Sequence, residues 1–346
     1  MEGIKKLTLV NPDDTKMIKN DKPRMDWLDA LRALAMLFVI YGHTYKQSEF
    51  FLFTSPVKVP MFFAITGYLL YGKTEDIKTF LNRILHKIVI PWLILSLGFG
   101  LRFILTQGFA YYANLAVETL IGKQSWFMVC LIIAQTLFYF LQKIFGSGWK
   151  LGIAVLLITA GGLTLSAFGV GDLFQFRTAL ICQFYLLIGY WLKKYESKLQ
   201  GLKVWMCLGW LGVYLALVIA SVFLFPKRTL DIHMDEYYNI PYCFLLITVG
   251  CSALFVCAQR IKKFPRWLCA IGRNTLVYYE HDIFWRGMAG RVFSLLAISI
   301  PATWYGGLIW LIISCVGCGF EAYILNRFFP EANGKKRKKK VVQTGA

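Results

Sequence analysis

The chain alternates between long apolar blocks and short polar segments. Most of the blocks are roughly 18–23 residues long, about the length that a helix needs to cross the hydrocarbon core of a bilayer. They cover about 28–45, 57–72, 84–106, 124–145, 150–168, 176–192, 203–225, 240–258, 268–287 and 305–327. The segment 111–121 is a further candidate for an interfacial or re-entrant piece. This pattern predicts an all-α, polytopic membrane protein with about ten transmembrane helices.

The composition agrees with this prediction. Of the 346 residues, 57% are hydrophobic and 16% are charged, whereas a soluble domain carries about 25% charged residues. Residues 1–27 are polar and contain no apolar stretch of the kind found in a cleavable signal peptide. We therefore expect an N-terminal tail at 1–27, one membrane domain at 28–327 and a basic C-terminal tail at 328–346. No internal repeat is obvious, which disfavours a transporter built from inverted repeats.

The positive charges predict the orientation. With the N-terminus placed in the cytoplasm, 28 lysines and arginines fall in the inner segments and nine in the outer ones. Inner loops of membrane proteins are enriched in these residues, so both termini are expected to be cytoplasmic. The basic run at 334–340 then lies near anionic lipid headgroups, and no nucleic-acid partner is expected. The outward loop at 225–241 carries acidic residues and His233, and is either simply solvated or in contact with substrate.

The cysteines give no sign of a metal site. The chain has nine cysteines, and most fall inside apolar blocks, where cysteine behaves as a small packing residue. Cys315 and Cys318 form a C-x-x-C pair without partners at zinc-ligand spacing.

Glu321 and Arg102 are polar groups within or near predicted spans, and either a packing pair or a functional role is compatible with them.

The first block carries the most unusual pattern. Arg32 and His43 are eleven positions apart, so both project from nearly the same stripe of a helix, about 16 Å apart along its axis. Each charged group at mid-membrane costs roughly 2.5–3.5 kcal/mol on insertion scales, which makes such groups candidates for function. The alternative is a snorkelling Arg32 and a histidine that only packs. Asp29, three residues before Arg32, is expected to pair with it.

The third block begins with a second cluster of cations. Arg83, His86 and Lys87 occupy neighbouring positions at the predicted cytoplasmic end of a helix. Such a cluster can bind phosphate groups. It can also reflect nothing more than the enrichment of cations in inner loops.

Six segments, in this order, resemble the signature of the acyltransferase-3 family of integral membrane acyltransferases. They are LDALRALA with the following His43, FFAITGYLL (62–70), RILHK with the following Pro91, SWFM (125–128), FYLLIGYWLKK (184–194) and GRNTLVYYEHDIFW (272–285). The resemblance extends over roughly 25–285. Two positions depart from the family pattern: Thr66 replaces the usual serine, and His86 replaces the second arginine of an Arg-x-x-Arg motif, although Lys87 retains a point charge.

The resemblance implies transfer of an acyl group, usually acetyl, from cytosolic acyl-CoA to a hydroxyl of a carbohydrate or related envelope molecule. It implies catalytic roles for His43 and Arg32. By the same resemblance, acetyl-CoA or another acyl-CoA is expected to be bound by Arg83, His86, Lys87 and Trp126. Contacts to the acceptor are expected from His281, Glu280 and Thr66. His281, which Glu280 and Asp282 flank in the sequence, could instead orient His43. The family places the enzyme in the plasma (inner) membrane of a bacterium and implies no metal.

The expected chemistry suits these residues. Acyl transfer to an alcohol needs a base for the hydroxyl proton and donors that stabilise the developing oxyanion. A neutral imidazole is suited to the first task. His43 could remove the proton directly or form an acyl-histidine intermediate. A multi-pass transporter or flippase, and a membrane sensor or binding module, remain as alternatives to the enzyme.

Overall fold

The computed structural model describes residues 24–45, 50–73, 75–225 and 229–335. Most of the two predicted tails, and Lys46, Lys227 and Arg228 from the charge count, lie outside these residues. In chain order the elements are α1 (Asp26–Thr44), α2 (Phe50–Lys58), α3 (Pro60–Leu70), α4 (Ile77–Ile84), η2 (Leu85–Val89), α5 (Ile90–Leu93), η3 (Ile94–Gly98), α6 (Arg102–Gln107), α7 (Phe109–Leu120), α8 (Trp126–Phe145), α9 (Trp149–Ala167), η4 (Leu173–Gln175), α10 (Phe176–Ile181), α11 (Gln183–Lys194), α12 (Glu196–Leu199), α13 (Val204–Leu224), β1 (Leu230–Asp231), β2 (Glu236–Tyr237), α14 (Ile240–Ala258), α15 (Arg266–Gly272), α16 (Thr275–Leu295), α17 (Trp304–Phe328) and η5 (Pro330–Asn333).

The predicted all-α class is confirmed. Within the described residues, seven helices are long and apolar enough to cross a membrane, or eight if the bent pair α10 and α11 counts as one span. The two other predicted spans fall on α1 and α16, long helices that carry several charged residues. The total of ten therefore stays a prediction, as does the cytoplasmic location of the termini.

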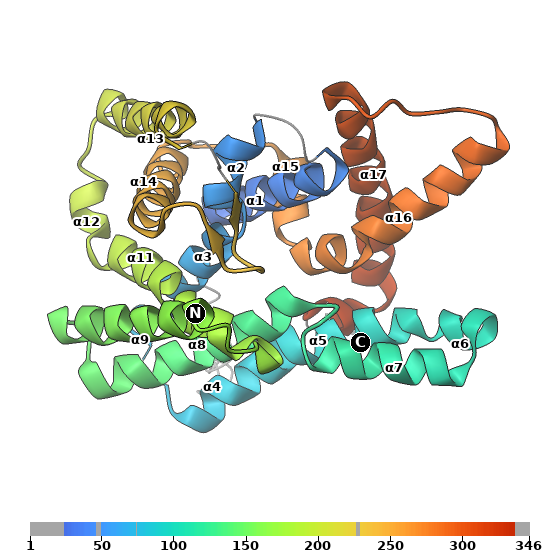
Figure 1. Ribbon diagram of the computed structural model, residues 1–346, viewed down its shortest axis with the longest axis horizontal. Helices are drawn as coiled ribbons and strands as arrows, with labels where there is room; N and C mark the ends of the chain where they lie inside the picture. Colours follow the sequence, from blue (N-terminus) through green and yellow to red (C-terminus); the bar gives the residue numbers. More distant parts are fainter. Residues whose placement is uncertain (1–23, 46–49, 74, 226–228, 336–346) are drawn as a thin grey trace, which may run out of the picture.

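Several predicted boundaries are wrong. The second span starts at Phe50 rather than at 57, because α2 and α3 run on with only a local break before Pro60, whose fixed φ suits a first helical turn. The ninth span is broken between α15 and α16. The segment predicted as interfacial or re-entrant forms α7, which lies beside α6 (Figure 1).

The third span contains two π-helical stretches, η2 and η3, on either side of the short α5. Pro91 lies in α5 and has no N–H to donate, so the regular ladder of hydrogen bonds is interrupted there. Stretches of this kind often occur at functional positions. They rotate the side chains before Pro91 relative to those after it, and Lys87 belongs to the first stretch.

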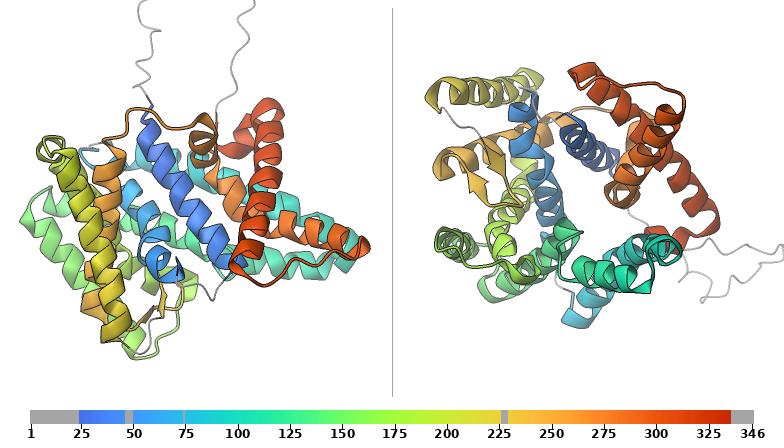
Figure 2. Two further views of the ribbon diagram at one scale, coloured as in Figure 1. Left: turned by 90° about the horizontal axis from the view of Figure 1, so that it is seen from above. Right: turned by 45° about the vertical axis from the view of Figure 1, so that its right-hand side comes forward.

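Helix α1 lies in the middle of the bundle. It contacts α2, α3 and α14 on one side and α15, α16 and α17 on the other, as the two views in Figure 2 show. Its acidic first turn and its histidine in the last turn complement the helix dipole. The start of α1 and the end of α17 lie at the same face of the molecule (Figure 2, left). Two cavities in the bundle are accordingly lined by residues of α1.

Helices α3 and α11 pack unusually closely because each contributes a glycine to their contact. A Cβ atom added at Gly67 would lie 1.9 Å from the carbonyl oxygen of Leu186. One added at Gly189 would lie 1.6 Å from the carbonyl oxygen of Ala64. Both glycines belong to the motifs that suggested the family, so these motif positions serve helix packing.

Replacing Gly189 by alanine is expected to lower the free energy of unfolding by about 1–3 kcal/mol, because the methyl group forces α3 and α11 apart. Gly161→Ala in α9 is the matched control, since a Cβ atom there meets nothing within 4 Å. Denaturant unfolding in mixed micelles measures both variants. Equal stability of the two would contradict the close contact.

Candidate functional site

Two neighbouring cavities lie along one stripe of α1. The first, of about 270 Å³, is lined by Arg32, and the second, of about 390 Å³, is lined by His43. We name them the Arg32 cavity and the His43 cavity. Met36 lines both, and Val39 lines the second. The prediction that Arg32 and His43 share one face of the first helix is therefore confirmed.

The two cavities have part of their walls in common. Four side chains line both of them: Met36, Phe62, Phe127 and Tyr279. Phe127 packs edge-on against Phe62 and lies at an angle to Tyr279. We call these four residues the constriction. Arg32 and Lys87 line the cavity on one side of them, and His43 lines the cavity on the other.

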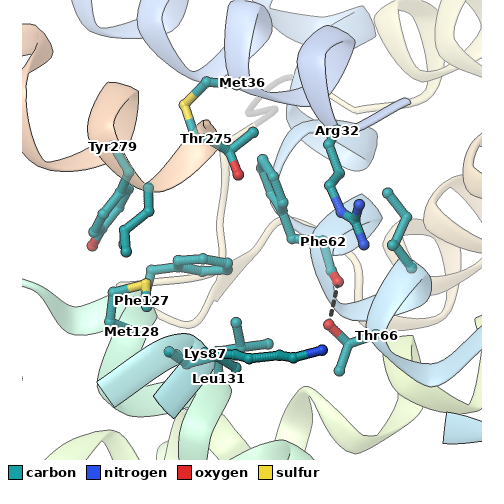
Figure 3. Close-up of a pocket in the computed structure, with 13 residues that line it drawn as sticks. Arg32, Met36, Phe62, Thr66, Lys87, Phe127, Met128, Leu131, Thr275 and Tyr279 are labelled. Atoms are coloured by element: carbon teal, nitrogen blue, oxygen red, sulfur yellow. Dashed lines mark hydrogen bonds between the residues drawn. The ribbon is translucent and has the colours of Figure 1, made fainter. Parts of the chain in front are cut away.

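The Arg32 cavity presents two cations from different segments. Arg32 projects from α1 and Lys87 from η2, and the tip of Thr66 lies between them (Figure 3). The Thr66 hydroxyl donates to the carbonyl oxygen of Phe62 at 2.9 Å. Arg32 pairs with the buried carboxylate of Asp29 at 3.1 Å, as predicted. A cavity with this lining suits an anionic ligand that also has an apolar part.

The His43 cavity has a more varied lining. The His43 side chain is 49% exposed, and its Nδ1 lies 3.8 Å from Oδ2 of Asp282. Asp282 is itself buried and accepts a hydrogen bond from Arg286 at 2.7 Å. A carboxylate near Nδ1 favours the tautomer in which Nε2 is free to accept a proton. A buried carboxylate therefore lies on the Nδ1 side of His43, at a distance longer than a direct hydrogen bond.

An aromatic pair lines the other side of the His43 cavity. Trp126 stacks on His233 with ring centroids 4.7 Å apart and planes inclined by 23°. His233 belongs to the turn between β1 and β2, and Asp231 Oδ1 accepts from its backbone N–H at 2.9 Å. Lys58, at the end of α2, also lines this cavity. The predicted outward loop therefore contributes directly to the cavity.

The other residues predicted to bind the donor do not line the Arg32 cavity. Arg83 forms an ion pair with Glu75, and His86 is exposed with its Nδ1 against the carbonyl oxygen of Asn82; neither lines the two cavities. Trp126, expected to bind the donor together with the cations, instead lines the His43 cavity. The structure thus brings Arg32, Lys87 and Thr66 together and separates them from Arg83 and His86.

His281 and Glu280 line neither cavity. Glu280 accepts hydrogen bonds from Ser96 at 2.7 Å and from Ser125 at 3.2 Å. The buried His281 contacts Glu321 through Nδ1 and the carbonyl oxygen of Leu95 through Nε2. Both ring nitrogens of His281 therefore have a buried polar partner. This pair joins α16 to α17 and η3, so Glu321 has a structural partner.

Removing His281 should therefore destabilise the protein. His281→Ala is expected to lower the free energy of unfolding by about 1–3 kcal/mol, because the Glu321 carboxylate and the Leu95 carbonyl oxygen each lose a buried hydrogen-bond partner. His86→Gln is the matched control on an exposed histidine, with an expected change within about 0.5 kcal/mol. Unfolding in mixed micelles measures both, and a loss below that of the control would contradict the ion pair.

The sequence did not identify Asp282, Lys58 or the constriction as parts of a site. Asp282 stood out only as an acidic residue next to His281, and nothing local indicates that it faces His43. Lys58 counted only as an outer charge. Phe62 and Phe127 belong to segments that resemble family motifs, and this resemblance is the feature of the sequence that could have indicated the constriction.

The comparisons with known proteins agree with the sequence motifs. A family model described as an acyltransferase domain matches residues 25–320, which is most of the chain. No curated protein and no solved structure matches the chain. The matched region includes both cavities and every element that lines them.

Proposed function

Because this chain belongs to the acyltransferase-3 family and is a membrane acyltransferase, we propose that it transfers an acyl group, most simply acetyl, from acyl-CoA to a hydroxyl group with His43 as the base. One observation carries this proposal. The Arg32 cavity and the His43 cavity lie end to end along one stripe of α1 and share the four side chains of the constriction. Family membership favours the enzyme over the transporter and the binding module.

The donor enters the Arg32 cavity. Its phosphates remain at the cytoplasmic end of this cavity, where Arg32 and Lys87 supply positive charge. The thin arm that carries the thioester runs along the apolar wall and through the constriction. The thioester carbonyl then reaches the His43 cavity.

The acceptor occupies the His43 cavity. The Trp126–His233 pair offers a flat aromatic surface for a ring such as that of a sugar, and a carbohydrate of the bacterial envelope is the acceptor that we propose. Nearby polar side chains, among them Asp231, are available to its other hydroxyls. The reaction then takes place in the plasma membrane with the donor on the cytoplasmic side.

The reaction proceeds by proton transfer and addition. His43 Nε2 takes the proton of the acceptor hydroxyl, and the oxygen attacks the thioester carbonyl. Asp282 orients the ring through Nδ1, and Lys58 supplies positive charge for the tetrahedral oxyanion. The intermediate collapses, the C–S bond breaks, and the imidazolium returns its proton to the sulfur of CoA. The products are an ester and free CoA.

The decisive experiment follows a labelled acyl group. Purified protein in nanodiscs is supplied with [¹⁴C]acetyl-CoA and a panel of envelope carbohydrates, and ester formation and CoA release are measured together. We expect stoichiometric release of CoA with labelled ester. Movement of a solute across proteoliposomes without any acyl donor, and no ester, would overturn the proposal.

A further inference from the structure

The side chain of Lys335, at the end of the described chain, is held by two asparagines. Lys335 Nζ donates to the side-chain oxygens of Asn274 and Asn326, both at 2.6 Å. Asn333 Nδ2 donates to the same two oxygens at 2.7 and 3.0 Å. These contacts fix the segment after α17 against the start of α16. The amide oxygens are neutral, so they orient the ammonium group without compensating its charge.

Further cations surround this lysine. Burial, together with the positive charges of Arg24 and Arg273, lowers the pKa of Lys335 to about 8. We call Arg24, Arg32, Arg273 and Lys335 the basic group. Among the described residues, Asp29 is the one carboxylate that forms an ion pair with a member of this group, and it pairs with both Arg24 and Arg32. Arg273 and Lys335 have no such partner among the described residues. The group therefore carries excess positive charge that an anion would neutralise.

The excess charge lies beside residues that line the Arg32 cavity. Asp29 connects Arg24 to Arg32, which lines the cavity. Gly334, with a φ of +64°, packs over the backbone of Lys87, and a Cβ atom there would lie 3.0 Å from the Lys87 carbonyl oxygen. Lys87 also lines the cavity. Lys335 therefore comes directly after Gly334 in the sequence, and Gly334 contacts the backbone of a lysine that lines the cavity.

The alternative phosphate site suggested by the sequence is less suitable. Arg83 is already paired with Glu75 and lines neither cavity. By contrast, a ligand that fills the Arg32 cavity and extends beyond it toward Arg273 and Lys335 would meet positive charge that no carboxylate compensates. Guanidinium and ammonium groups form strong, charge-assisted hydrogen bonds to phosphate oxygens.

We infer that Arg24, Arg273 and Lys335 form a phosphate-binding site beside the Arg32 cavity, which holds the nucleotide end of acyl-CoA. This inference rests on the proposed function and gives these three residues a role that was not expected from the sequence, although Arg273 lies within one of the motif-like segments. Residues 330–335, which follow α17, then complete the donor site. A phospholipid headgroup offers the same phosphate chemistry and is the other source to be distinguished.

The test measures binding with and without the nucleotide. The full chain, in nanodiscs of neutral phosphatidylcholine, is titrated with CoA and with pantetheine, which lacks the nucleotide. Lys335→Met and Arg273→Gln are each expected to weaken CoA binding at least about tenfold, the loss expected for one charge-assisted hydrogen bond, and to leave pantetheine binding unchanged. Lys335→Arg should retain most of the affinity. Lys262→Met, an exposed lysine between α14 and α15, is the matched control and should have no effect.

The other outcomes overturn specific parts of the inference. Unchanged CoA binding by both variants, with binding by the wild type, would reject the phosphate site and leave the proposed function intact. Equal losses for CoA and pantetheine would show that the residues only support the fold. An effect of Lys335→Met confined to nanodiscs that contain anionic phosphatidylglycerol would assign the site to lipid. No CoA binding by the wild type would reject the proposed function itself.

Discussion

Replacing His43 by glutamine is expected to reduce the rate of acyl transfer about 10²–10⁴-fold, the range that general base catalysis contributes. Glutamine retains hydrogen-bonding capacity but cannot accept the hydroxyl proton. The side chain lies in an open cavity and is 49% exposed, so the variant should fold normally. Initial rates of ester formation from labelled acetyl-CoA measure the effect, with binding of CoA as the internal check. Wild-type rates in this variant would show that His43 is not the base.

The partner of His43 provides a finer test. Asp282→Asn keeps the shape of the side chain but removes the charge that faces Nδ1. A smaller reduction is expected than for His43→Gln, together with a changed pH profile of the transfer rate. Combining both substitutions should cost little more than His43→Gln alone, since the two residues act as one unit. Additive losses would mean that Asp282 acts independently, for example by holding Arg286.

Opening the constriction is expected to change which donors the enzyme accepts. Phe62→Ala removes a ring from the wall that both cavities share, so longer acyl chains can pass. One methylene group more or less in an apolar site changes the ratio of kcat/KM between two substrates by roughly 10–200-fold. We therefore expect the ratio of kcat/KM for hexanoyl-CoA over acetyl-CoA to rise at least about tenfold. Rates with acetyl-, butyryl- and hexanoyl-CoA give this ratio.

A matched control separates the constriction from general loosening of the protein. Leu131 lines the Arg32 cavity but not the His43 cavity, so Leu131→Ala removes apolar volume away from the constriction and should leave the chain-length ratio near that of the wild type. Phe62→Trp provides the reverse change and should slow transfer while CoA still binds. If Phe62→Ala and Leu131→Ala altered the ratio equally, the constriction would not select the acyl chain.

Much of the fold was predictable because it depends on local patterns. Each of the ten apolar blocks coincides with a helix or a broken helix, since the hydrophobicity of a segment reflects its own environment in lipid. The exact breaks were not predictable. The continuation through Pro56 and the π-helical turns around Pro91 depend on how neighbouring helices accommodate the missing hydrogen bonds.

The candidate site was predictable in part. The stripe that joins Arg32 to His43 follows from the periodicity of one helix, and the Asp29–Arg32 pair follows from a spacing of three residues. The cluster of Arg83, His86 and Lys87 was grouped by sequence proximity, yet Lys87 alone lines a cavity because the π-helical turn and Glu75 direct its neighbours elsewhere. Proximity along the chain does not determine which cavity a side chain faces.

The sequence by itself therefore determined the helical membrane architecture, the family and the face of α1 that carries Arg32 and His43. These properties depend on composition, helical periodicity and short motifs. Only the tertiary structure decided that Asp282 faces His43, that His281 pairs with Glu321 and that Lys335 contacts Asn274. Each of these contacts joins segments that are distant along the chain, and the packing of whole helices brings them together.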